Sequence, residues 1–332
     1  MPIWSEILNE LSSTQANGNP PDFDGVRRKH LAGLYNHTKR NVILYASGWL
    51  QKSEVPPSLV SISDEDMQAF MEVTNGLQGD ELDLIIHSPG GSPEAAEAIV
   101  SYLRARFNHV RVIVPQLAMS AATMISCAAD ILVLGKHSFL GPTDPQLVLP
   151  TSLGVRAVPA QAILDQFDLA KHECADPAKL SAWLPMLNQV GPDLIVQCES
   201  ALEMSKDLVR TWLETYMFKD SDDRLARAQE ISEWLSGHQN FKSHSRHIPR
   251  NEAEEHAMRI TRLESDDIFQ DAVLSVFHAT THTFSGTRAV KIVENHMGRA
   301  FIKQHSLPQM PSFQLDIGQA APEGTVLEAD LL

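Results

Sequence analysis

Ser120 is the residue whose type and setting point most directly to chemistry. It lies in the segment Pro115–Thr123, after a short apolar run and before a predicted helix, with alanines at 118, 121 and 122. A serine at a helix start lies in the positive field of the backbone. The N–H of the next residue, Ala121, can then stabilise a developing oxyanion. The alternative is that Ser120 only caps the helix.

A second segment whose residues could take part in catalysis is Ser88-Pro89-Gly90-Gly91. It follows the predicted strand Leu82–His87 and precedes the predicted helix Pro93–Phe107. Two glycines at a strand end let the backbone approach a ligand closely and present N–H groups to it. The alternative is a tight turn that needs glycine only for its dihedral angles.

Taken together, two long segments resemble the Clp protease and signal peptide peptidase A superfamily, which has the crotonase-type fold: SPGGSPEAAEAIVSYLR and VPQLAMSAATMISCAADILVLGKHSFLGP. Within that superfamily the chain is most similar to the serine dehydrogenase proteinase family. Four further segments carry this similarity: NVILYASGWL, LGPTDPQL, SHSRHIP and HTFSGTRAVKIVENHMGRAFIKQ. The resemblance implies that Ser120 is a nucleophile, and that Gly90, Gly91 and Ala121 supply N–H groups to the oxyanion.

The resemblance leaves the base that would activate Ser120 open. In Clp proteases a histidine lies just beyond the segment corresponding to HSFLGPTDPQ, where this chain has Thr143 beside Asp144. The signal peptide peptidase branch uses a lysine from a later helical region, and Lys171 lies at a similar separation from the serine. Such a lysine must be buried to act as a base. His244 lies in a segment that resembles the region of the acidic triad member, and it could act as base or orient one.

Two further residues could support this site. Asp144 could orient the base or cap a turn with Thr143. His87 ends the strand before the glycine turn, so it could line the substrate pocket or be a structural histidine.

The sequence favours neither a metal nor a cofactor. His278 and His282 have helical spacing but lack the glutamate of the HExxH pattern. No cysteine lies near the histidine cluster at positions 238, 244 and 247, and no Walker A or GxGxxG motif is present.

Composition narrows the partners and the compartment. The 332 residues carry a formal net charge of −15, which argues against nucleic acids and anionic membranes as partners. The three cysteines form no CxxC pair, and the start of the chain lacks the basic and apolar regions of a signal peptide. No apolar stretch is long enough to span a bilayer. We therefore expect a cytoplasmic protein.

The elements that must position these residues alternate between strand and helix from Asn41 to Leu134. This pattern predicts an α/β fold with largely parallel pairing. We expect an N-terminal helix and linker (1–25), a crotonase-like domain (26–305) with a helical arm at about 150–235, and a flexible acidic tail (306–332). Thr287–Lys303 is predicted to be a helix.

These features predict a serine peptidase that hydrolyses peptide bonds in peptide or protein substrates. Two alternatives on the same fold are a non-catalytic oligomeric scaffold and an acyl-CoA hydratase or thioesterase. The resemblance also implies a homo-oligomer.

Overall fold

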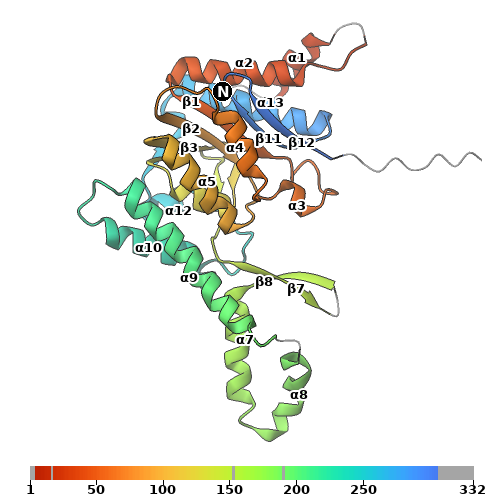
Figure 1. The fold of residues 1–332 in the computed structure, drawn as a ribbon, viewed down its shortest axis with the longest axis vertical. Helices are drawn as coiled ribbons and strands as arrows, with labels where there is room; N and C mark the ends of the chain where they lie inside the picture. The colour runs from red at the N-terminus through yellow and green to blue at the C-terminus, as the bar shows by residue number, and fades with distance from the viewer. Residues whose placement is uncertain (1–3, 16–17, 152–153, 189–190, 306–332) are drawn as a thin grey trace, which may run out of the picture.

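The computed structural model describes residues 4–15, 18–151, 154–188 and 191–305. Figure 1 shows a body of strands and helices from which an arm of helices and one hairpin projects. The tail that was predicted to be flexible, residues 306–332, lies outside the described residues.

The body is built on a seven-stranded sheet with the strand order β10-β5-β3-β2-β1-β11-β12. In chain order its strands are β1 (Asn41–Ser47), β2 (Glu81–His87), β3 (His109–Val114), β5 (Ile131–Leu134), β10 (Ile260–Arg262), β11 (Ala289–Asn295) and β12 (Ala300–Gln304). Strands β10 to β1 pair in parallel, whereas β11 and β12 are antiparallel to their neighbours. The predicted α/β class with largely parallel pairing is confirmed.

Helices cover both faces of this sheet, because alternate strand residues carry apolar side chains to opposite sides. On one face, α2 (Phe23–Thr38) and α13 (Asp267–Gly286) enclose a core that includes Leu44, Ile85 and Ile292. The N-terminal helix α1 (Trp4–Thr14) packs on α13.

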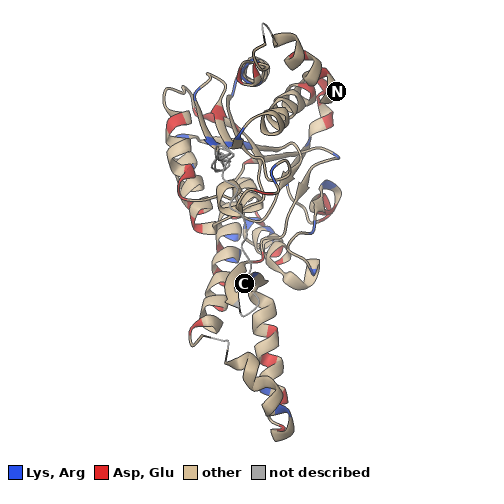
Figure 2. Cartoon of the chain, turned by 90° about the vertical axis from the view of Figure 1, so that its right-hand side faces the viewer, with Lys and Arg blue, Asp and Glu red and all other residues tan. Residues whose placement is uncertain are grey.

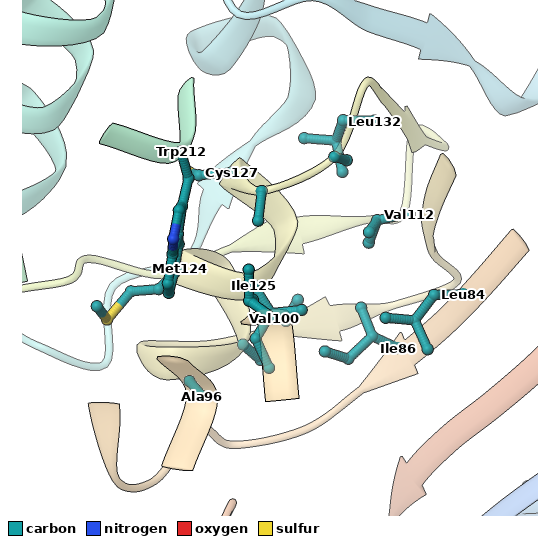
Figure 3. Packing of buried hydrophobic residues seen from close by; sticks show 14 of the residues in the cluster. Leu84, Ile86, Ala96, Val100, Val112, Met124, Ile125, Cys127, Leu132 and Trp212 are labelled. Carbon is teal, nitrogen blue, oxygen red and sulfur yellow. The ribbon is translucent and has the colours of Figure 1, made fainter. Parts of the chain in front are cut away.

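The opposite face carries the helices that surround the candidate site. They are α4 (Asp66–Thr74), α5 (Pro93–Arg106) and α6 (Ala121–Cys127). Figure 3 shows Ile125 of α6 in one apolar cluster with Val100 of α5 and Ile86 of β2. Every residue of α6 is buried, so the helix that follows Ser120 is held rigidly against the sheet.

Residues 287–303 form β11 and β12, so the helix predicted there is wrong. Every residue of Ala289–Asn295 is buried, which suits a strand covered on both faces and not an amphipathic helix. The β-branched residues in this stretch also favour a strand. Gly298, with φ of +85°, occupies the turn between the two strands.

The arm is part of a long insertion between β6 (Phe139–Leu140) and β9 (Ile248–Pro249), and the last part of this insertion packs on the body again. Its elements are β7 (Gln146–Thr151), β8 (Gly154–Pro159), α7 (Ala160–Glu173), α8 (Pro177–Leu187), α9 (Leu194–Trp212), a π-helical turn (Leu213–Met217), α10 (Arg224–Ser236) and α11 (His238–Phe241). The predicted helical arm is confirmed, but the sequence analysis missed the β7–β8 hairpin. Helix α9 returns to the body, where Trp212 packs in the same cluster as Met124 and Cys127 of α6 (Figure 3).

The remaining elements are short. They are α3 (Pro57–Val60), α12 (Arg250–Glu255), a 3₁₀ turn (Leu263–Ser265) and β4 (Leu117–Ala118). Figure 2 shows acidic residues along the helices of both body and arm, with basic residues between them. None of the helices in the described ranges is long and apolar enough to cross a membrane.

Candidate active site

Ser120 occupies a strained turn between a strand and a helix. Strand β4 ends at Ala118 and α6 begins at Ala121, while Ser120 has φ of 53° and ψ of −120°. A residue other than glycine rarely adopts positive φ, and such strain costs about 1–3 kcal/mol and clusters at functional sites. This is the type of turn that presents a nucleophilic serine at the end of a strand.

The hydroxyl of Ser120 does not cap the helix that follows it. Ser120 stands at the N-cap position of α6, but its side chain accepts no hydrogen bond from the first turn. The alternative that Ser120 serves only as a helix cap therefore has no support in the side-chain geometry.

The glycine turn after β2 packs directly against Ser120. A Cβ atom added to Gly90 would lie 2.6 Å from the carbonyl oxygen of Met119, 2.7 Å from Ser120 Cβ and 3.0 Å from the Ala121 nitrogen. Only glycine fits this close approach. The two segments singled out from the sequence thus form one site.

Gly91 is held on its other side by Ile62. The Ile62 N–H donates to the Gly90 carbonyl at 2.8 Å, and the Ser92 N–H donates to the Ile62 carbonyl at 3.0 Å. In an extended chain, the backbone groups of successive residues point to opposite sides. The Gly90 carbonyl and the Ser92 N–H both face Ile62, and Gly91 lies between them. The Gly91 N–H therefore points away from Ile62.

Two backbone donors of this site have no acceptor in the described part of the chain. They are the N–H groups of Gly91 and Ala121, whereas the Gly90 N–H donates to Ser88 Oγ at 3.2 Å. Ala121 is buried, and a buried donor without an acceptor is costly. Such donors beside a nucleophile suit a developing oxyanion.

A histidine–carboxylate cluster lies in segments that adjoin the small sheet containing β4. The small sheet β4-β6-β9 brings the chain after β6 and the loop before β9 to the side of the Ser120 turn. Gly141, the residue after β6, packs on Met119, since an added Cβ would lie 3.1 Å from Met119 Cα. Asp144 follows Gly141 at this edge, and His244 precedes β9.

Asp144 binds two histidines at once. His244 Nδ1 lies 2.7 Å from Asp144 Oδ1, and His238 Nδ1 lies 3.0 Å from Oδ2. The carboxylate is 2% exposed, whereas the two histidine side chains are 26% and 19% exposed. A carboxylate bound to Nδ1 orients the ring and leaves Nε2 to accept a proton, as in the serine protease triad. Among the described residues, no hydrogen bond joins the Ser120 hydroxyl to either histidine.

The sequence pattern around His238 indicated no more than a weak metal ligand. The one available signal was its proximity to His244 in the same His-rich loop. Its contact with Asp144 spans 94 positions of sequence, so local patterns do not predict it.

Lys171 does not reach this site within the chain. It lies on α7 in the projecting arm (Figure 1), where its side chain is 60% exposed and pairs with Asp168. A lysine base requires burial in an apolar pocket. The exposure of Lys171 does not provide that environment.

His87 is fully buried on the face of the sheet that α13 covers. Its ring packs on Trp49 and Phe277, and its Nδ1 accepts the Leu117 N–H at 3.3 Å. Burial lowers the pKa of His87 to about 3, so the ring is neutral at pH 7. His87 supports the strand that leads to Ser120.

Cys127, a possible nucleophile, and His282, a possible metal ligand, are both buried and have structural roles. Burial raises the pKa of the Cys127 thiol on α6 to about 12, so this cysteine stays protonated. His282 Nε2 lies 3.0 Å from the Trp4 carbonyl and holds α1. Within the described residues, no group of three or more His, Cys, Asp or Glu could hold a metal ion.

Comparisons with known proteins agree with the resemblance in the motifs. Residues 60–181 match the family model described as ClpP-like SDH-type serine proteinase. That segment includes the glycine turn, Ser120 and Asp144, whereas His238 and His244 follow its end. The ClpP-like α/β fold predicted from the motifs is thereby supported.

The similar curated proteins are two uncharacterized proteins of Methanocaldococcus jannaschii. Each is 42% identical to this chain, one over 87 residues and the other over 66. The matches cover 26% and 20% of this chain and 30% and 23% of the relatives, so less than a third of either relative is spanned. Among solved structures, a mutant of ClpP1 from Listeria monocytogenes is 14% identical with a TM-score of 0.33, covering 75% of this chain and 99% of its own.

Proposed function

Because residues 60–181 match the family model of ClpP-like SDH-type serine proteinases, we propose that the chain is a serine peptidase with Ser120 as nucleophile. The observation that carries this proposal is the conformation of Ser120. Its φ of 53° presents a hydroxyl that caps nothing, directly against the glycine turn. A structural serine would have no reason to hold this strain.

In the proposed reaction, Ser120 Oγ attacks the carbonyl carbon of a peptide bond. The N–H groups of Gly91 and Ala121 bind the oxyanion of the tetrahedral intermediate. The base takes the serine proton and transfers it to the leaving amine as the C–N bond breaks. Water then attacks the acyl-enzyme by the same route in reverse and releases the new carboxylate.

His244 is the proposed base, with Asp144 as the residue that orients it. The short contact from Nδ1 to a buried carboxylate favours His244 over Lys171, which is exposed on the arm. Hydrogen bonds between a catalytic serine and its base often tighten only when substrate binds. We therefore expect the hydrogen bond between Ser120 and His244 to form in the substrate complex.

Replacing Gly91 by alanine tests the oxyanion site. The added Cβ would lie 2.3 Å from the Ile62 carbonyl oxygen, so the turn and its N–H must move. Losing one oxyanion donor typically costs about 10²–10³-fold in kcat, and we expect a loss of that size. The measurement is kcat for a fluorogenic peptide that the wild type cleaves.

The matched control for that variant is Gly76→Ala. Gly76 also has positive φ, +85°, but nothing lies within 4 Å of an added Cβ. This variant carries the backbone strain without the contact at the site, so it should retain kcat. Equal losses of kcat in both variants would contradict the oxyanion role of Gly91.

We also propose that the active form is a homo-oligomer whose subunits meet through the arm. The hairpin exposes Val148 and Val155, which are 67% and 73% exposed. Several exposed apolar residues lie on the arm helices: Leu169, Leu180, Leu184, Met186 and Val196. Large exposed apolar patches commonly mark interaction sites.

The double variant Val148→Asp/Val155→Asp tests the arm as an interface. Because both side chains are exposed in the single chain, the substitutions should not prevent it from folding. Light scattering should show a fall in mass towards that of the monomer. A wild type that is already monomeric, or a variant of unchanged oligomeric mass, would contradict this interface.

A further inference from the structure

A buried charged cluster lies beside the glycine turn, on the side away from Ser120. Lys291 of β11 contacts Asp66, the first residue of α4, with Nζ 2.7 Å from Oδ1 and 2.9 Å from Oδ2. Tyr45 of β1 donates its phenol to Asp66 Oδ2 at 2.8 Å. All three residues are at most 1% exposed.

Stability alone does not account for this cluster. Burying two opposite charges costs more than burying well-packed apolar side chains, so such pairs contribute little net stability. Burial lowers the pKa of Lys291, and the Asp66 carboxylate opposes that shift. Burial and the same carboxylate raise the pKa of Tyr45, so the phenol stays a donor.

The cluster fixes the backbone on both sides of Ile62. Lys291 Nζ donates to the Ser61 carbonyl at 2.7 Å, and the Ser63 N–H donates to Asp66 Oδ2 at 2.9 Å. One residue earlier, Ser47 Oγ donates to the Val60 carbonyl at 2.6 Å. Residues 60–63 thus depend on buried side chains, since they belong to no strand of the main sheet.

Ile62 in turn fixes Gly91. Its N–H and carbonyl bind the residues on either side of Gly91, and the Gly91 Cα lies so close that an added Cβ would collide with the Ile62 backbone. A shift of Ile62 must therefore shift Gly91 and the direction of its free N–H. The buried side chains hold residues 60–63, and Ile62 holds the glycine turn. Direct contacts therefore link the charged pair to the candidate site.

We propose that Lys291 and Asp66 are positioning residues that aim the Gly91 N–H at the oxyanion through Ile62. This proposal rests on the proposed function only in taking Gly91 as an oxyanion donor. Neither residue touches the substrate. Their effect is on the transition state, because the oxyanion forms after the substrate has bound.

The test replaces the whole pair by apolar side chains, Lys291→Met/Asp66→Leu, so that no unpaired charge stays buried. We expect kcat for peptide hydrolysis to fall by about 10–100-fold. This is less than the loss for removing an oxyanion donor, because the Gly91 N–H is displaced and not removed. KM should change less than about threefold, since ground-state binding does not use the oxyanion site. A smaller folded fraction would also lower the apparent kcat at constant KM, so kcat is calculated from the concentration of folded protein.

The same strand provides the matched control. Glu294 of β11 forms a buried ion pair with Arg27 on the opposite face of the sheet, and both side chains are 0% exposed. The variant Arg27→Met/Glu294→Leu removes an equally buried pair that has no contact with residues 60–63. It should retain the wild-type kcat. A comparable fall in kcat in this control would overturn the proposal.

Hydrogen exchange gives a readout that does not depend on catalysis. The amides of Ile62 and Ser92 are hydrogen-bonded in the wild type, and both should exchange at least about tenfold faster in Lys291→Met/Asp66→Leu. Unchanged protection of these amides would overturn the positioning role, whatever the activity. A wild type that hydrolyses no peptide would contradict the proposed function instead, and the exchange rates would still decide the positioning role.

Discussion

Replacing Ser120 by alanine is expected to lower peptide hydrolysis by about 10⁴-fold or more, because loss of a triad serine removes nearly all of kcat. The fold should survive, since the Ser120 hydroxyl caps no N–H of α6. Alanine at this position must adopt the same φ of 53°, so the backbone strain is retained. The measurement is kcat on a fluorogenic peptide, with the melting temperature recorded in parallel.

Ser126→Ala is the matched control for that variant. Ser126 lies on α6, the helix that Ser120 precedes, is fully buried and donates its hydroxyl to the Ala122 carbonyl. Its loss should cost some stability but not hydrolysis. Full activity in Ser120→Ala, or equal losses of activity in the two variants, would rule out Ser120 as the nucleophile.

Replacing His244 by alanine should lower kcat by about 10²–10⁴-fold, the usual contribution of a general base. The variant removes the ring that Asp144 orients and leaves Ser120 without a proton acceptor. His238→Ala should cause a smaller loss, because it removes only the second partner of Asp144. The measurement is kcat for the same peptide in the two histidine variants.

Lys171→Ala distinguishes the two bases that the sequence left open. Lys171 is exposed on the arm and pairs with Asp168, so its loss should leave kcat unchanged. Activity lost in Lys171→Ala and kept in His244→Ala would contradict the proposed base. It would indicate instead that the lysine reaches Ser120 from another subunit.

The parts of the fold that were predicted correctly are local in sequence. The strands β1, β2, β3 and β5 are apolar runs with clear boundaries, and the turns that hold Gly90 and Ser120 follow directly on strands. A short motif and its neighbours contain most of the information about such turns. Their packing against each other follows from parallel strands that end at one edge of the sheet.

Two parts of the fold were missed, for different reasons. Residues 289–295 contain apolar side chains at strand and helix spacing alike, and the burial of both faces is visible only in the folded sheet. The β7–β8 hairpin includes prolines at 150 and 159, which weaken a strand signal.

The proposed base and the proposed positioning residues depend on contacts between residues that are distant in sequence. Asp144 and His244 are 100 positions apart, and Lys291 and Asp66 are 225 apart. Lys171 was considered for its spacing from Ser120, but spacing along the chain does not reveal that the arm carries this lysine away from the body. Such pairs require the assembled fold.

The most direct test of the account is the site of a covalent label. The wild-type protein is treated with a fluorophosphonate, which reacts with activated serines, and the modified residue is identified by mass spectrometry. The account predicts one adduct on the peptide that contains Ser120, formed much more slowly in His244→Ala. No adduct, or an adduct on another serine, would contradict the central claim and favour a non-catalytic scaffold or an acyl-CoA enzyme on the same fold.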